Sequence, residues 1–142
     1  MDNGRKRLSW EETALRLAFD IANYRSQDCY VQVGAVAVKH NKELVLGYNG
    51  PPSGVEVDWS DRNERRKRML HAEYNALASI RPGEVEFLAV TALPCCECIK
   101  IIAHKKIPKV IFRDLLVGYD DKLTRRLATE FGIELKQLNI ET

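Results

Sequence analysis

Two short motifs carry residues with the types and spacing of a metal site. They read His71-Ala72-Glu73 and Pro94-Cys95-Cys96-Glu97-Cys98. If a helix begins at the second motif, Cys95 and Cys98 share one face of it, and the free N–H groups and positive dipole end there favour thiolates over thiols. Thiolates bind Zn²⁺, and His71 would supply a third ligand. A Cys₂His set leaves the fourth tetrahedral position to water, as in catalytic rather than structural zinc sites.

Glu73 is expected to move protons without coordinating the ion. It lies about 200° around a helix from His71, which is a poor position for binding the same ion through the same face. The pattern matches H-x-E…P-C-x-x-C, the signature of zinc deaminases, in which the carboxylate is the general acid and base. Water activated by the metal would attack C4 of a cytosine or C6 of an adenine. Glu73 would take the proton of that water, deliver it to the ring nitrogen and help ammonia to leave.

Other interpretations of these residues stay open at this point. The two cysteines and His71 could be buried thiols and a core histidine, and Glu73 could be a solvated helical residue. The zinc could also be structural, closed by a fourth ligand such as Cys29, Cys96 or His104. Closure by Cys96 is disfavoured, because on a helix Cys96 would point about 100° away from Cys95.

Alternating helical and strand patterns surround the motifs. A capping box at Ser9 and Glu12 begins a helix over 10–24, and Pro94 can open a helix over 95–105. Residues 49–68 are rich in Gly, Pro and charge, which indicates a long functional loop. The remaining expected elements are a hairpin of strands 33–38 and 44–48, a helix over 72–80, strands at 87–91, 110–112 and 134–138, and a helix over 121–131. This order predicts one α/β domain over 1–142, a three-layer α/β/α sandwich with a mixed five-stranded sheet.

Composition limits the function classes. The 142 residues are 45% hydrophobic and 30% charged, which is typical of one globular domain, and no apolar run approaches the ~18 residues of a membrane span. Glu11 and Glu12 stand where a secretory signal would be apolar, so we expect a cytoplasmic protein whose crowded cysteines serve metal or redox chemistry. The net charge of +2 argues against nucleic acid as a partner and is compatible with a small anionic ligand.

The chain resembles the deoxycytidylate (dCMP) deaminases of the cytidine deaminase superfamily. The metal motifs belong to the whole superfamily, whereas the segment at 47–54 is similar to dCMP deaminases in particular. The resemblance covers most of the chain and includes RSQD at 25–28, QVGAV at 32–36, GYNGPPSG at 47–54, DR at 61–62, HAEYNA at 71–76 and KVIF at 109–112.

The resemblance implies an enzyme that converts dCMP to dUMP and ammonia with one catalytic Zn²⁺ per chain. It implies a cytidine deaminase-like fold and a homo-oligomer, a hexamer or smaller, often activated by dCTP and inhibited by dTTP with Mg²⁺. Carried over by position, Asn49 would hold the sugar or phosphate, Ala72 would offer backbone to the base, and Tyr119 would stack near the substrate. Ser26 and Arg62 are expected as further substrate contacts.

Phosphate recognition is the part of the function for which the sequence departs from relatives. Cys29 stands where many relatives have proline, and 29–32 lack the arginine of some phage-type members. Basic residues just before the first metal motif could supply the charge, or could be a solvated face: Arg62, Arg65, Arg66, Lys67 and Arg68.

Two other functions stay open beside dCMP deamination. One is deamination of another cytosine or adenine substrate, such as cytidine, a 5-substituted dCMP or tRNA adenosine, although the modest net charge argues against tRNA. The other is a catalytically silent, zinc-stabilised module that binds nucleotides to regulate something else. An intact Glu73 would have no purpose in such a module.

Overall fold

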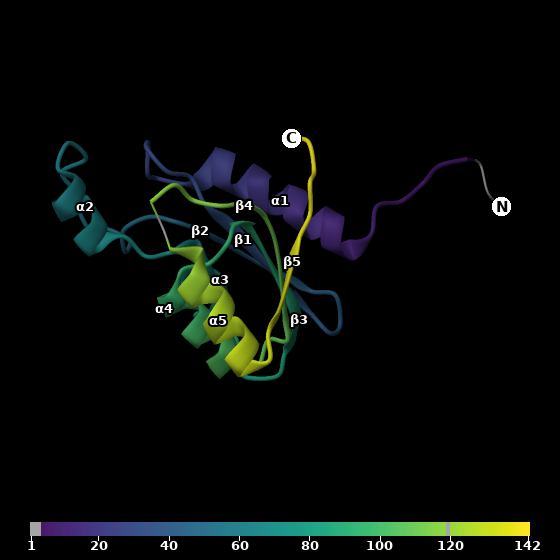
Figure 1. Cartoon of the computed structure of the whole chain (residues 1–142). Helices are drawn as coiled ribbons and strands as arrows, with labels where there is room; N and C mark the ends of the chain where they lie inside the picture. Colours follow the sequence, from purple (N-terminus) through teal and green to yellow (C-terminus); the bar gives the residue numbers. More distant parts are fainter. Residues whose placement is uncertain (1–3, 119) are drawn as a thin grey trace.

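A computed structural model describes residues 4–118 and 120–142. Within these residues a five-stranded sheet lies between helices (Figure 1). The helices are α1 (Trp10–Arg25), α2 (Arg62–Arg68), α3 (Ala72–Leu77), α4 (Cys96–His104) and α5 (Asp121–Phe131). The strands are β1 (Gly34–Lys39), β2 (Leu44–Tyr48), β3 (Val85–Ala92), β4 (Lys109–Asp114) and β5 (Glu134–Gln137). None of the helices in the described part is long and apolar enough to cross a membrane.

The sheet is mixed, as predicted, and its directions bring several loops to one end. The strand order is β2-β1-β3-β4-β5. β1 pairs antiparallel with β2 and β3, whereas β3, β4 and β5 run parallel. The start of β1 therefore lies at the same end of the sheet as the ends of β2, β3 and β4. The segments that follow β2 and β3 lead to the two motifs, so the topology places both motifs at this end.

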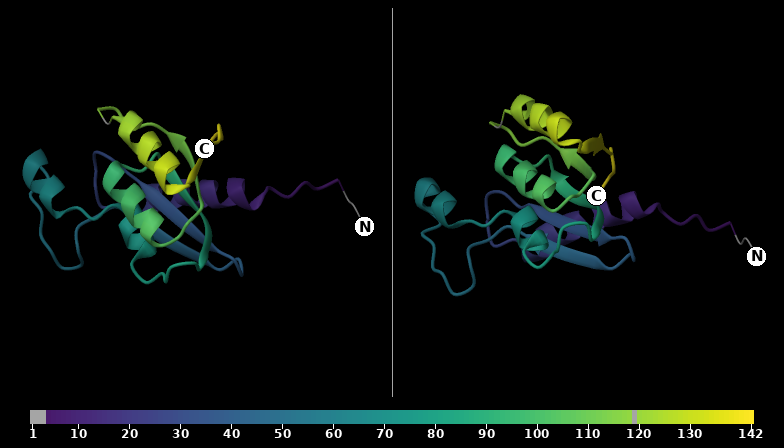
Figure 2. Two further views of the ribbon diagram at one scale, coloured as in Figure 1. Left: turned by 60° about the horizontal axis from the view of Figure 1, so that its bottom comes forward. Right: turned by 90° about the horizontal axis from the view of Figure 1, so that it is seen from below.

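Alternation along the strands forms two cores, one on each face of the sheet. Ala35 and Ala37 of β1 belong to a buried cluster with residues of α3, α4 and α5, whereas Val36 and Val38 pack with residues of α1. Successive strand side chains point to opposite faces, so one apolar run supplies both layers. Figure 2 shows α1 separated by the sheet from α3, α4 and α5. The predicted three-layer α/β/α sandwich is confirmed.

The segment 49–68 is not entirely a loop, because α2 forms within it. Asp61 caps this helix by accepting hydrogen bonds from the backbone N–H groups of Asn63 and Glu64. At the base of the segment Gly50 and Leu70 exchange backbone hydrogen bonds of 3.2 and 2.8 Å and form an isolated bridge. α2 itself stands off one end of the sandwich (Figures 1 and 2). The observed order thus has one helix more than the predicted order, and α3 ends at Leu77 rather than at 80.

Close contact between helix and strand backbones depends on two glycines. A Cβ atom added to Gly34 would lie 2.0 Å from the carbonyl oxygen of Ala18 in α1. One added to Gly47 would lie 2.3 Å from the carbonyl oxygen of Ala72 in α3. Neither contact leaves room for a side chain, so α1 rests directly on β1 and α3 on β2. The Asn75 Nδ2 atom also donates a 2.7 Å hydrogen bond to the Tyr48 carbonyl, which fixes α3 against the end of β2.

Candidate active site

The two motifs lie at the starts of helices, and the side chains of the two N-cap residues make no capping hydrogen bond. His71 is the N-cap of α3 and Cys95 is the N-cap of α4, and neither side chain caps its own helix. Their carbonyls accept the first helical hydrogen bonds, from the N–H groups of Asn75 and Ile99. Because backbone hydrogen bonds alone begin each helix, the imidazole of His71 and the thiol of Cys95 can point toward each other.

His71, Cys95 and Cys98 form a compact group of metal-binding atoms. The Nδ1 atom of His71 lies 3.3 Å from Sγ of Cys98 and 3.6 Å from Sγ of Cys95. An ion about 2.05 Å from nitrogen and 2.3 Å from sulfur in tetrahedral geometry implies N···S separations of about 3.6 Å. The three residues therefore fit zinc. In the described part of the chain no further histidine, cysteine or carboxylate joins the group, so Cys29, Cys96 and His104 do not close it.

Hydrogen bonding polarises the two thiols in opposite directions. The hydrogen bond with Cys98 lowers the pKa of the Cys95 thiol from 9.0 to about 4, and the neighbouring His71 adds to this effect. The same hydrogen bond, together with burial, raises the pKa of Cys98. The hydrogen bond with Cys95 in turn raises the pKa of His71. The group thus presents a thiolate at neutral pH, the form in which cysteine binds a metal ion.

Glu73 lies beside this group without belonging to it. Its side chain is in the first turn of α3 and only 4% exposed. Burial raises the pKa of this carboxyl above its usual value of 4.5, and its hydrogen bond with Cys98 opposes that shift. A carboxyl whose pKa is moved toward neutrality can both accept and donate a proton. Glu73 is thus not among the three grouped metal-binding residues, and its role as proton carrier stays a prediction.

A cavity of about 650 Å³ opens in front of these residues. This volume falls within the range of roughly 300–1,000 Å³ typical of small-molecule sites. His71, Glu73 and Cys95 lie at one part of its wall, and the rest comes from α2, the end of β3, the segment before β1 and the segments that follow β2, β3 and β4. Among the other lining residues are Asp28, Tyr30, Val31, Val33, Asn49, Ala72, Leu93, Leu116, Arg62, Arg65 and Arg66. The predicted positions Asn49, Ala72 and Arg62 therefore share one cavity with the metal-binding group.

Comparison with known proteins identifies the family. Residues 8–114 match the family described as the cytidine and deoxycytidylate deaminase zinc-binding region. The chain belongs to this family. It is 31% identical over 141 residues to an uncharacterised deaminase from the luxG 3′ region of Aliivibrio fischeri, covering 93% of this chain and 95% of the relative.

Two relatives carry the name of one activity. Deoxycytidylate deaminase of Mus musculus is 35% identical over 116 residues, which cover 74% of this chain and 65% of the mouse protein. The crystal structure of dCMP deaminase from cyanophage S-TIM5, in complex with dCMP and dUMP, superposes with a TM-score of 0.77 at 26% identity and covers 94% of this chain and all of that one. The predicted membership of the dCMP deaminase family, its cytidine deaminase-like fold and its deaminase class are thereby confirmed.

In this deaminase the Asn49 side chain is largely committed to neighbouring loops. Its Oδ1 atom accepts from Ser26 Oγ at 2.5 Å and from the Val33 N–H at 2.9 Å, and its Nδ2 atom donates to the Val31 carbonyl at 2.8 Å. One Nδ2 hydrogen is left for a ligand. Ser26 does not line the cavity but holds Asn49 in place. Tyr119 lies outside the described residues, and its stacking on a substrate stays a prediction.

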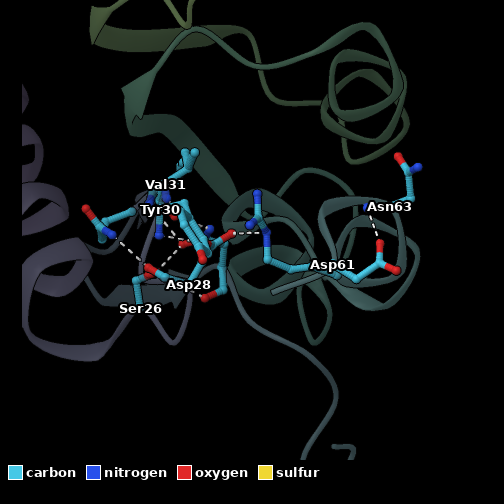
Figure 3. A network of polar contacts seen from close by, with 10 residues as sticks. Ser26, Asp28, Tyr30, Val31, Asp61 and Asn63 are labelled. Carbon is cyan, nitrogen blue, oxygen red and sulfur yellow. Dashed lines mark hydrogen bonds and ion pairs between the residues drawn. The ribbon is translucent and has the colours of Figure 1, made fainter. Parts of the chain in front are cut away.

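Sequence reasoning gave no role to Asp28 and Tyr30 of this deaminase. Asp28 Oδ1 accepts hydrogen bonds from the N–H groups of Tyr30 and Val31, at 2.8 and 3.2 Å (Figure 3). Its Oδ2 atom lies 3.5 Å from Nε of Arg65, and these two side chains are 6% and 8% exposed. The Arg65 guanidinium also lies 4.4 Å from the centre of the Tyr30 ring. Asp28 belongs to the RSQD motif, but its sequence neighbours do not reveal a partner in α2.

Proposed function

We propose that this chain hydrolyses dCMP to dUMP and ammonia with a zinc ion held by His71, Cys95 and Cys98. The observation that carries the proposal is the convergence of these three ligand atoms, within 4.8 Å of one another, beside the buried Glu73 in one cavity. The names of the mouse and phage relatives, and the dCMP and dUMP bound in the phage structure, support the choice of substrate.

The reaction exchanges the 4-amino group of the cytosine ring for oxygen from water. When bound, zinc would supply Lewis acidity that lowers the pKa of a water at the site. The Glu73 carboxylate takes a proton from the attacking water and gives it to N3 of the ring. It then passes the second proton of that oxygen to the amino group, which leaves as ammonia, while the water oxygen stays on C4. The raised pKa of Glu73 suits both directions of transfer.

The remaining predicted contacts would orient the nucleotide in the cavity. Ala72 is fully buried at the start of α3, where its backbone can face the base, and Asn49 has one amide hydrogen left for the sugar. Water exclusion around the base follows from the apolar part of the lining, which includes Val33 and Leu93. These residues would thus hold the base and the sugar of the nucleotide at different parts of one cavity.

The direct test is ammonia release by zinc-loaded protein with dCMP, CMP, deoxycytidine, cytidine, 5-methyl-dCMP and tRNA. We expect dCMP to be turned over far better than deoxycytidine. Glu73→Gln should keep its zinc and lose roughly 10²–10⁴ in kcat, the usual contribution of acid–base catalysis. The matched control is Glu97→Gln, because Glu97 is 73% exposed in α4 and pairs only with Lys100 among the described residues. A Glu73→Gln enzyme with the wild-type rate would contradict the proton-carrying role, and absence of ammonia with every substrate would contradict the reaction.

Assembly and regulation are part of the same proposal through the family resemblance. We infer a cytoplasmic homo-oligomer, a hexamer or smaller, that responds to dCTP and dTTP with Mg²⁺. Sedimentation at micromolar concentration tests the assembly, and a monomer there would contradict it. Rates measured at low dCMP with and without each effector test the regulation.

A further inference from the structure

The structure divides the basic run of α2 into three groups with different contacts. Lys67 and Arg68 both pair with Glu64, at 3.0 and 2.6 Å, and Arg68 also donates to the Glu64 carbonyl. Neither Lys67 nor Arg68 lines the cavity. Their charges are therefore satisfied on the outer surface of the helix.

Arg62 and Arg66 are the two members of the run that face the cavity with their charge uncompensated. Both line it, both are exposed, and neither forms an ion pair with a residue in the described part of the chain. They lie four residues apart and so share one face of α2. The acidic side chains in the lining are Asp28, which is paired with Arg65, and Glu73 at the metal-binding group. One wall of the cavity thus carries two free guanidinium groups.

Arg65 connects this wall to the rest of the molecule. α2 stands off the sandwich, as Figures 1 and 2 show. The buried ion pair of Arg65 with Asp28 and its stacking on Tyr30 hold the helix against the segment that precedes β1. Asp28 is itself fixed by two backbone N–H groups (Figure 3). Arg65 lies between the two exposed arginines in sequence, so its anchor sets the position of both.

We propose that Arg62 and Arg66 bind the 5′-phosphate of a mononucleotide substrate and that Arg65 is a positioning residue that holds α2 over the cavity. The proposal rests on the proposed function, because the reacting base would lie at the metal-binding group of the same cavity. Guanidinium groups form forked, charge-assisted hydrogen bonds with phosphate oxygens, and a nucleoside offers no group of matching charge. The two arginines therefore determine the preference for nucleotide over nucleoside.

The test compares the ratio of kcat/KM for dCMP to kcat/KM for deoxycytidine among variants of the zinc-loaded protein. Arg62→Ala and Arg66→Ala should each lower this ratio by about 10- to 100-fold, the range expected for lost hydrogen bonds to a charged group. Lys67→Ala and Arg68→Ala are matched controls, since they remove the same charge from the same helix and should leave the ratio at the wild-type value. An unchanged ratio in the double variant Arg62→Ala/Arg66→Ala, or an equal fall in the controls, would overturn the proposal.

Binding of the product separates this site from the reaction. Calorimetry should show that wild-type protein binds dUMP more tightly than deoxyuridine, and that the double variant has lost the difference. If wild-type protein releases no ammonia from dCMP but shows this difference, the phosphate site stands and the proposed function fails. If dCMP is deaminated while dUMP and deoxyuridine bind equally well, the reaction stands and the phosphate site is wrong. Protein that neither reacts nor distinguishes the two ligands contradicts both.

The positioning role of Arg65 has its own readout. Arg65→Gln should raise KM for dCMP while leaving kcat for dCMP near the wild-type value, because the arginines that contact the phosphate remain but are no longer held in place. Asp28→Asn, which keeps the acceptor for the Tyr30 and Val31 N–H groups, should raise KM in the same way. An equal loss of kcat/KM for dCMP and deoxycytidine, accompanied by a fall in Tm, would show a merely structural role instead.

Discussion

Replacement of Gly47 by alanine tests whether the contact between β2 and α3 positions the reacting residues. The new methyl group would lie 2.3 Å from the Ala72 carbonyl oxygen, 2.5 Å from the Ala76 nitrogen and 2.8 Å from the Ala76 Cβ atom. All three are α3 atoms that cannot rotate away. To reach an ordinary van der Waals distance, α3 must move from the sheet by about 1 Å. His71 occupies the N-cap position of this helix and Glu73 lies in its first turn, so both would move relative to Cys95 and Cys98.

Two effects of different size follow from this displacement. Overpacking of a core contact costs about 1–3 kcal/mol of unfolding free energy. For a domain of this length that corresponds to a fall in Tm of roughly 3–12 °C. A shift of about 1 Å between reacting groups costs on the order of 10² in rate. The fall in kcat should therefore be much larger than the loss of folded protein could explain. Zinc affinity should fall as well, because the His71 nitrogen leaves the tetrahedral position.

The assay measures Tm, zinc per chain and ammonia release on Gly47→Ala beside Gly83→Ala. Gly83 has a φ of +88° and open space around its missing Cβ, so alanine there introduces backbone strain without a collision. We expect the control to lose about 1 kcal/mol of stability and to keep its zinc and its rate. Wild-type kcat and zinc content in Gly47→Ala would refute the idea that this backbone contact positions the site.

Four further changes have expected outcomes that can be measured directly. Chelation of zinc should lower Tm in scanning calorimetry, because an ion bound only by the folded state stabilises it. Cys98→Ala should lose stoichiometric zinc by metal analysis, and a variant with full occupancy would show that the ligand assignment is wrong. Asn49→Ala should cost about 1–3 kcal/mol in denaturant unfolding, since it leaves the Val33 N–H and the Val31 carbonyl without their partner. Gly132→Ala should cost roughly 1 kcal/mol with no change in rate, because Gly132 ends α5 at a φ of +74°.

The metal-binding group could be predicted from sequence because its information is local. Cys95 and Cys98 are three residues apart, and a proline stands directly before Cys95, the N-cap of α4. His71 and Glu73 likewise lie at the start of a short apolar helix. Alternation of strands and helices then determines which end of the sheet receives both motifs. The ligands within each motif are thus predicted from spacing within a few residues, and the pairing of the two motifs from the order of the elements.

The role of α2 could not be predicted because its stability comes from tertiary contacts. The sequence RNERRKR has no apolar period, and its cap at Asp61 resembles any turn residue. Its five basic side chains are equivalent in the sequence. Only the fold shows that Arg65 is buried against Asp28, because Asp28 precedes the β1–β2 hairpin in the chain and Arg65 follows it. The same limit applies to Asn49, whose type indicates a ligand contact but whose amide mainly serves the loops at 26–33.

The bridge between Gly50 and Leu70 separates residues 51–69, which include α2, from the first metal motif at His71. Backbone hydrogen bonds between Gly50 and Leu70 close residues 51–69 at their base, one residue before His71. Doubling the length of a flexible loop costs only about 0.6 kcal/mol in closure entropy. Residues 51–69 could therefore change in length at small cost, provided that a cation such as Arg65 still pairs with the buried Asp28. Under the proposed function, a relative with a different segment here could accept a different nucleotide, and a protein engineer could graft such segments between Gly50 and Leu70.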